Sequence, residues 1–173
     1  MIDQSCKQFQ IVLNVDAQVT PVPTRARTRR RRINVYLELL IRKPGRPTED
    51  FELVDHSGSC LLSSGPGPKQ VIDLSCLEDN PIVTLHFMLP ASQDLHFPSN
   101  VYKAIGLQPA AEGCPLEANE HIDRQFVRCN VSHNGKYVSL QDKNETAGEY
   151  SFALFVYQGD VLYAVCDPRI INK

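Results

Sequence analysis

Six arginines within a short stretch are the residues of this sequence with the most definite chemistry. They stand directly before an alternating apolar segment, at Arg25, Arg27, Arg29, Arg30, Arg31 and Arg32. From Thr24 to Arg46 nine basic residues face one acidic residue, a net charge of +8, whereas the rest of the chain carries nine basic and nineteen acidic residues, a net charge of −10. Guanidinium groups neutralise phosphates and pair with carboxylates, so the run predicts an anionic partner.

The strand that follows the arginines limits where they can lie. A row of unpaired guanidinium groups cannot be buried in a core. We therefore expect residues 17–32 to form a basic loop at the rim of a sheet, and we expect neutral replacement of the six arginines to change stability by no more than ~0.5 kcal/mol. Nucleic acid, another anionic ligand, an acidic protein and a solvated loop without a ligand are the alternatives. The run contains no aromatic residue to stack on a base, and the acidic remainder would repel a polyanion.

Cysteines and histidines in the second half of the chain provide the residue types of a zinc site. The candidates are Cys114, His121, Cys129 and His133. Structural zinc is usually held by two close pairs of ligands such as C-x-x-C, which this spacing does not provide. Cys129 also alternates with Val127 and Val131, a pattern that predicts a core thiol instead. We expect no metal and no cofactor.

Local motifs of catalysis are weak in this sequence. No G-x-S-x-G motif surrounds Ser59 and Cys60, and Pro66 and Pro68 remove backbone N–H donors from the glycine-rich stretch that precedes Lys69. His56 and His86 fall at a loop edge and on the polar face of a predicted strand, where we expect both to be solvated. We expect no enzymatic activity, with a hydrolase whose site is assembled from distant loops as an alternative.

Strands account for most of the predicted structure. Period-2 alternation predicts them at residues 9–15, 33–41, 51–54, 71–74, 83–89, 127–131, 137–140, 150–157 and 161–166. Asn134-Gly135 predicts a type I′ hairpin turn, and Gln158-Gly159-Asp160 predicts a second tight hairpin. We expect at most one or two short helices, one of them at 99–106, and long loops at 17–32, 56–70 and 106–123. This composition predicts a single all-β domain over residues 1–173, an antiparallel sandwich.

Two short motifs near the C-terminus carry a resemblance to known folds. Residues 146–152, "TAGEYSF", resemble the tyrosine-corner pattern D-x-G-x-Y-x-C of immunoglobulin-like domains at Gly148 and Tyr150, with Thr146 in place of the acid and Phe152 in place of the cysteine. The closing "DPRIIN" resembles the tail of small bacterial β-sandwich proteins of the DP-EP type. These resemblances imply an immunoglobulin-like sandwich in which the Tyr150 ring is buried.

Cysteine usage and hydropathy lead to expectations about location and partners. The six cysteines form no C-x-x-C pair, no apolar run reaches the ~20 residues of a membrane helix, and the first residues do not resemble a secretory leader. We expect a cytoplasmic protein without membrane contact, with six reduced thiols, several of them buried. The predicted function is non-enzymatic binding of another protein or an anionic ligand, and an edge strand could mediate a homodimer.

Overall fold

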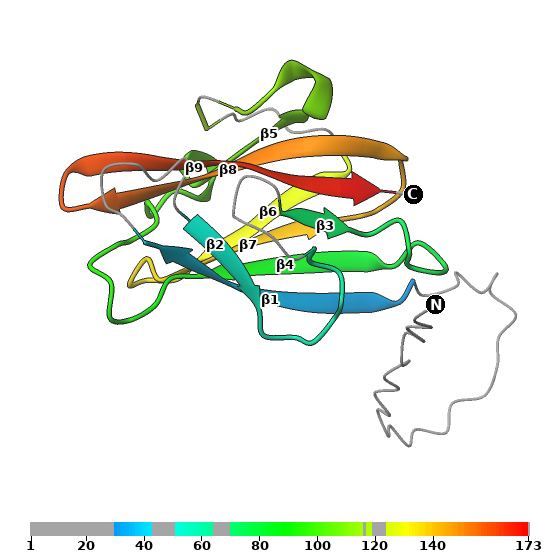
Figure 1. Ribbon diagram of the computed structural model, residues 1–173, viewed down its shortest axis with the longest axis horizontal. Helices are drawn as coiled ribbons and strands as arrows, with labels where there is room; N and C mark the ends of the chain where they lie inside the picture. Colours follow the sequence, from blue (N-terminus) through cyan, green and yellow to red (C-terminus); the bar gives the residue numbers. More distant parts are fainter. Residues whose placement is uncertain (1–29, 43–50, 64–69, 116, 119–123, 173) are drawn as a thin grey trace, which may run out of the picture.

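Two β-sheets packed face to face form the described part of the protein in the computed structural model (Figure 1). The structure describes residues 30–42, 51–63, 70–115, 117–118 and 124–172, and within them the chain is all-β, as predicted. The predicted strand at 9–15 and residues 17–29 of the predicted basic loop lie outside the described residues. In the part of the chain that the structure describes, no helix has the length and apolar character needed to cross a membrane.

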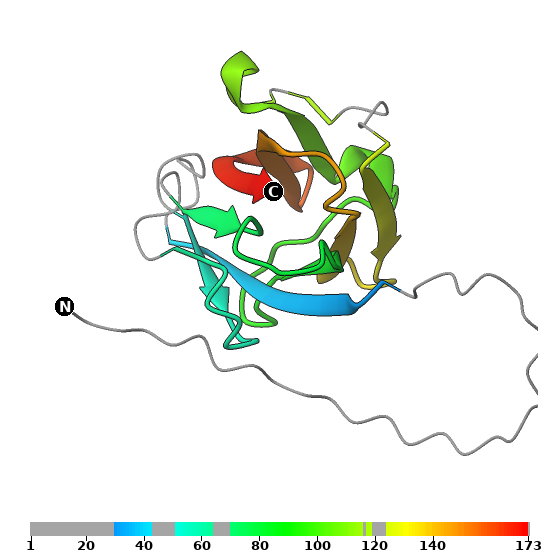
Figure 2. The ribbon, with the colours of Figure 1, turned by 90° about the vertical axis from the view of Figure 1, so that its right-hand side faces the viewer.

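Nine strands are divided between the two sheets of the described chain. The five-stranded sheet has the order β2-β1-β4-β7-β6, from β1 (Arg32–Ile41), β2 (Phe51–Asp55), β4 (Ile82–Met88), β6 (Phe126–Val131) and β7 (Tyr137–Asp142). The four-stranded sheet has the order β3-β9-β8-β5, from β3 (Val71–Asp73), β5 (Ile105–Pro109), β8 (Gly148–Gln158) and β9 (Val161–Asn172). Figure 2 shows the two layers from one end of the strands.

The central strands of the first sheet confirm the predicted alternation. Val35, Leu37 and Leu39 of β1 are fully buried, whereas their neighbour Tyr36 is 42% exposed. Val83, Leu85 and Phe87 of β4 are also fully buried. Successive side chains of a strand point to opposite faces, so one face of each strand packs into the core and the other remains on the surface. Each large side chain buried in this way stabilises the fold by about 1.5–3 kcal/mol.

The predicted all-antiparallel pairing is only partly correct. β1 pairs with β4 in parallel, with Tyr36 opposite His86, and β3 pairs with β9 in parallel, with Ile72 opposite Ile170. The remaining strand pairs are antiparallel. Between β1 and β4 the chain forms β2 and then crosses to the other sheet for β3, which is why it returns beside β1 in the same direction. Alternation in a sequence does not determine strand direction.

Aromatic side chains join the two sheets inside the core. The rings of Phe87 in β4 and Phe152 in β8 lie 5.4 Å apart between centroids, and both are fully buried. Tyr150 is 9% exposed and meets Phe126 in an edge-to-face contact at 4.8 Å, so the predicted burial of its ring is confirmed. A Cβ at Gly148 would lie 3.1 Å from Tyr150 Cε2, so this ring needs the small residue beside it.

The hairpin of β8 and β9 confirms the predicted turn at 158–160 and extends both strands. Gln158 pairs with Val161, and Gly159 has a positive φ of 55°. β9 continues through Asp167-Pro168, although proline has no N–H to donate to a ladder. The register shifts here: Ser151 pairs with Arg169 and Ala153 with Cys166. Because a bulge leaves residues unpaired, it accommodates Pro168 inside a long strand.

β5 replaces part of a predicted helix and part of a predicted loop. The helix predicted at 99–106 is only a three-residue 3-10 turn, η2 (Val101–Lys103), capped by the Asn100 side chain, and η3 (Ala110–Glu112) is a second such turn. Ile105–Pro109, expected mainly as loop, pairs with β8 instead. A Cβ at Gly106 would approach Glu117 O to 2.8 Å, so close packing determines this segment more than its local pattern does.

The predicted inward face of β6 was wrong. Val127 is 42% exposed and Phe126 is buried, the reverse of the expected orientation, while Val131 packs against the core. The register shift between Arg128 and Asn130 explains how Phe126 and Val131, an odd number of residues apart, both face inward. A bulge of this kind reverses the alternation locally. The side chain of Cys129 lies outside the described residues.

The hairpin between β6 and β7 is present, but its turn is not the predicted type I′. Only Gly135 of the Asn134-Gly135 pair has a positive φ, 67°, whereas a type I′ turn needs two such residues. Gly135 N donates to Ser132 O at 2.9 Å, and Asn134 Oδ1 accepts from Lys136 N at 3.1 Å. The turn is thus wider than predicted, with the glycine in its left-handed position.

Candidate functional site

Three aromatic rings form a row on the outer face of the five-stranded sheet. Tyr36 from β1 and His86 from β4 stack at 4.5 Å between centroids with 11° between their planes. Tyr137 from β7 continues the row, 5.5 Å from His86 at 28°. We call these three side chains the aromatic row. The stacked rings lie on the outer face of the sheet, where Tyr36 remains exposed.

The register of the sheet brings the aromatic row together. Tyr36 and His86 are direct partners in the parallel β1–β4 pair, and they are fifty positions apart in the sequence. Tyr137 pairs with Met88, two residues along β4 from His86, and therefore meets His86 diagonally. Aromatic side chains reach such diagonal neighbours on one face of a sheet. The row therefore depends on the pairing of three strands.

His86 is held between its neighbours by both ring nitrogens. Nε2 lies 2.9 Å from Asn34 Oδ1, and Nδ1 is hydrogen-bonded to the Tyr137 hydroxyl. Because Asn34 Oδ1 is an acceptor, Nε2 carries the proton and Nδ1 accepts from Tyr137, the pattern of a neutral imidazole. Burial lowers the pKa of His86 below its ordinary value of 6.5. The expectation of a solvated His86 is therefore wrong.

The stability of the protein should depend on pH through His86. Its unfolded pKa is near 6.5 and its folded pKa is lower, so between the two the unfolded state binds a proton that the native state does not. The free energy of unfolding should thus fall as the pH falls through that interval and should not vary through this group at higher pH. Urea unfolding of the wild type and of His86→Gln at a series of pH values tests this, and identical pH profiles would contradict it.

A turn after β2 borders the aromatic row on the β1 side. His56 N donates to Tyr36 O at 2.9 Å, and the His56 ring, exposed as predicted, lies 2.9 Å from Glu38 Oε2. Burial would raise the pKa of Asp55, but hydrogen bonds from Ser59 and Ser57 outweigh it and lower that pKa. The ionised carboxylate of Asp55 thus fixes the turn beside Tyr36.

Arg30 anchors the arginine run to the body of the protein. Its Nε donates to Asn80 O at 3.0 Å, its Nη2 bonds both Asn80 O and Lys143 O, and its Nη1 lies 2.6 Å from Glu145 Oε1. These partners belong to the segment before β4 and the connection between β7 and β8. The guanidinium is therefore a structural clasp, which differs from the solvated loop expected for all six arginines.

Arg31 and Arg32 are the arginines that the structure places on the surface. Arg31 is exposed and its carbonyl accepts from Ile82 N at 2.9 Å, while Arg32 is exposed as the first residue of β1, not as the last residue of a loop. Because strand residues alternate, Arg32, Asn34 and Tyr36 lie on one face. Arg25, Arg27 and Arg29 lie outside the described residues.

The weak metal candidates are divided among different parts of the fold. Cys114 follows η3 with Sγ 3.6 Å from Pro115 O, and His133 is exposed in the β6–β7 hairpin. His121 lies outside the described residues, as does the Cys129 side chain. Among the residues that the structure describes, no three His, Cys, Asp or Glu side chains form a group that could hold a metal ion. Cys60 and Cys76 are exposed, so the expected burial does not apply to these thiols.

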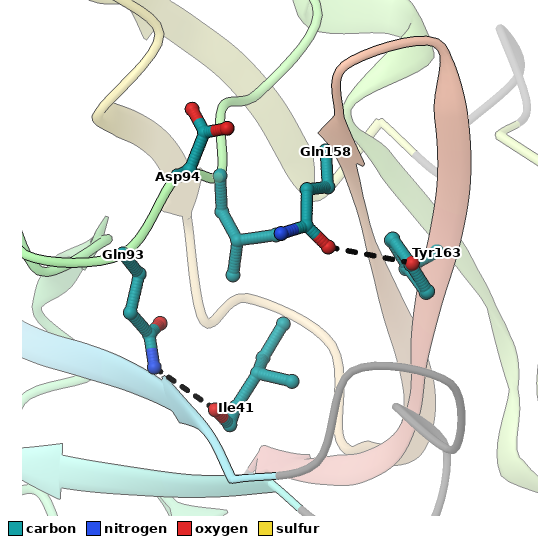
Figure 3. Close-up of a pocket in the computed structure, with 6 residues that line it drawn as sticks. Ile41, Gln93, Asp94, Gln158 and Tyr163 are labelled. Atoms are coloured by element: carbon teal, nitrogen blue, oxygen red, sulfur yellow. Dashed lines mark hydrogen bonds between the residues drawn. The ribbon is translucent and has the colours of Figure 1, made fainter.

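A small hollow lies between the end of β1 and the hairpin of β8 and β9. It measures about 110 Å³ and is lined by Ile41, Gln93, Asp94, Leu95, Gln158 and Tyr163 (Figure 3). Gln93 Nε2 donates to Ile41 O at 2.9 Å, and Tyr163 Oη lies 3.5 Å from Gln158 Oε1. Gln93 Oε1 is buried in the wall without a hydrogen-bond partner, and the small volume suits a few water-sized molecules better than a larger ligand.

A wider depression of about 630 Å³ lies at the tips of two hairpins. It contains the remaining residues singled out in the sequence, His133, Asn134 and Gly135, beside Gly159 and Asp160. His96 and Tyr157 stack in its wall at 5.8 Å between centroids. Gly135 is in close contact there, since a Cβ would lie 2.8 Å from Phe97 O. The turn residues of the two hairpins line this depression. Among the described residues, no pair of side chains suited to catalysis meets there.

Sequence analysis missed the aromatic row. From the sequence, Tyr36 and Tyr137 were predicted only to be strand residues. Both are aromatic residues at positions where the alternation predicts a solvent-facing side chain, and this signal could have identified them. The comparisons with known proteins do not assign this face either. Neither the models of known protein families nor the curated protein sequences match the chain.

Proposed function

We propose that the protein is a non-catalytic binding module whose ligand surface is the outer face of the five-stranded sheet. The observation that supports this most directly is the aromatic row, in which Tyr36 keeps 42% of its surface exposed on a rigid sheet. Exposed aromatic side chains on regular elements provide large contact areas at a small cost in conformational entropy. The proposal agrees with the non-enzymatic binding function predicted from the sequence.

The contacts of His86 support binding over catalysis. Asn34 and Tyr137 engage both ring nitrogens, so the imidazole is fixed as part of the surface, whereas a general base needs a nitrogen directed at its substrate. No comparable arrangement among the described residues supports the hydrolase alternative. A cytoplasmic location and an immunoglobulin-like relationship remain parts of this proposal that rest on the sequence.

Two of the four sheet edges are less suited to the interaction than the face. β6 is one edge of the five-stranded sheet and has a bulge between Arg128 and Asn130, and β5 at the edge of the four-stranded sheet ends in Pro109. Bulges and prolines on edge strands hinder the addition of another strand. We therefore favour a ligand on the sheet face over a homodimer through an edge strand.

Affinity capture with matched variants tests the binding face. Immobilised wild type, Tyr36→Ala and Tyr102→Ala are incubated with native extract, with and without nuclease. Tyr102 is 49% exposed on η2, outside the five-stranded sheet, and is the control for loss of an exposed tyrosine. We expect wild type and Tyr102→Ala to retain the same species and Tyr36→Ala to lose them. Equal retention by Tyr36→Ala would place the binding surface elsewhere.

A further inference from the structure

We infer that the ligand of this face is a single-stranded nucleic acid, with phosphates at Arg31 and Arg32 and a base stacked on Tyr36; this ligand class rests on the proposed function. Arg32, Asn34 and Tyr36 follow one another along the outer face of β1, and Arg31 precedes them on the surface. At a rise of about 3.3 Å per residue, Arg32 and Tyr36 are roughly 13 Å apart along the strand. Cationic groups and an aromatic ring in line along a sheet can follow a nucleic-acid backbone and its bases.

The charge of the face permits a polyanion although the chain as a whole is acidic. The outward residues of β1 up to Tyr36, and those of β4 and β7, contain no acidic side chain: Arg32, Asn34, Tyr36, Ile82, Thr84, His86, Met88, Tyr137, Ser139 and Gln141. The first outward acid of β1 is Glu38, which is paired with His56 at the far side of Tyr36. Asp142, at the end of β7, is fully buried. The outward positions of these three strands therefore add no repulsion up to Tyr36, and the nearest exposed acids of the β4 side, Glu78 and Asp79, precede the strand.

The ring geometry favours a planar ligand. Tyr36 uses one ring face to stack on His86, and the residue remains 42% exposed beside the turn that contains His56 and Ser57. A nucleobase can extend such a stack.

The exposed Tyr36 ring also favours single strands over duplexes. Bases of a duplex are already stacked on each other and are read in the grooves by inserted helices or ribbons. An unpaired base, by contrast, has a free face that can stack on the exposed Tyr36 ring. Around the row, Asn34 and Gln141 provide hydrogen-bonding groups for base edges or sugars.

Fluorescence anisotropy with labelled oligonucleotides tests this ligand class. The probes are single-stranded RNA and DNA of about 12 nucleotides, within the site sizes of sheet-based single-strand binders, and the corresponding duplexes, with heparin as a competitor. The proteins are wild type, Tyr36→Ala, Tyr36→Phe, Tyr102→Ala and the double variant Arg31→Gln/Arg32→Gln. Urea unfolding of each variant verifies that the fold is retained.

We expect the wild type to bind a single strand more tightly than a duplex. Tyr36→Ala should weaken this binding about tenfold or more, the effect of removing one base–aromatic stack, whereas Tyr36→Phe and Tyr102→Ala should retain it. The double arginine variant should reduce the dependence of log K on log salt by about 0.7 for each phosphate contact that is lost. Tighter binding of the RNA probe or of the DNA probe shows which of the two nucleic acids is the ligand.

Two outcomes would overturn the inference. If oligonucleotides and heparin compete equally and Tyr36→Ala binds as well as wild type, the face is only an attractive surface for polyanions. If no single strand binds even at low salt, the ligand is of another class. In that case loss of captured species by Tyr36→Ala in native extract still supports the binding face, so failure of the ligand class and failure of the proposed function are distinguishable.

Discussion

Replacement of Phe87 by alanine should lower the free energy of unfolding by about 3–5 kcal/mol. Phe87 is fully buried in β4, and its ring meets Phe152 of β8 at 5.4 Å, so it bridges the five-stranded and the four-stranded sheet. Removal of the ring loses its transfer free energy and leaves a cavity that the two sheets cannot close. Urea unfolding followed by circular dichroism measures the loss. Phe87→Leu, which retains much of the volume, should cost less.

A double-mutant cycle tests the contact between the sheets directly. Phe152→Ala alone should cost a similar amount, and the double variant should be more stable than the sum of the two losses predicts, by about 0.5–1.5 kcal/mol for an aromatic pair. This coupling arises because one truncation already removes the partner of the other ring. Strict additivity would show that the two rings do not meet in solution and would contradict the sandwich packing described above.

Replacement of Arg30 by alanine should cost about 1.5–3 kcal/mol of stability, the range for hydrogen bonds to charged groups. Its guanidinium bonds the carbonyls of Asn80 and Lys143, which would lose a charged donor. The ion pair with Glu145 should contribute less, because the two side chains are 29% and 56% exposed and surface pairs are worth about 0–1 kcal/mol. Glu145→Gln should therefore be much milder than Arg30→Ala. Thermal and urea unfolding measure both.

Neighbouring substitutions provide the controls for the clasp. Arg31→Ala removes an exposed arginine next to Arg30 and should stay within ~0.5 kcal/mol of wild type. Arg30→Lys should recover only part of the loss, because one ammonium cannot reproduce the fork that bonds separate acceptors. If Arg30→Ala and Arg31→Ala are equally mild, Arg30 is not a clasp, and the small effect on stability expected from the sequence holds for both residues.

The sequence by itself determined where most strands lie and which side chains they bury. Val35 to Leu39 and Val83 to Phe87 alternate with polar residues, and this period follows from the geometry of a single extended chain. The hairpin at 158–160 is likewise a local feature, because its glycine meets the conformational needs of the turn without help from distant residues. The need to keep unpaired guanidinium groups out of the core was also evident from residue type alone.

The tertiary structure decided everything that depends on which strands become neighbours. Ile105–Pro109 is a strand because β8 pairs with it, and Val127 faces outward because a bulge against β7 reverses the alternation. The aromatic row and the Arg30 clasp join positions separated by 50 or more residues. Such contacts follow from strand order and register, which arise when distant segments pack together and bury a common core. No local period in the sequence encodes that arrangement, and this is the physical reason why the candidate site emerged only in the folded chain.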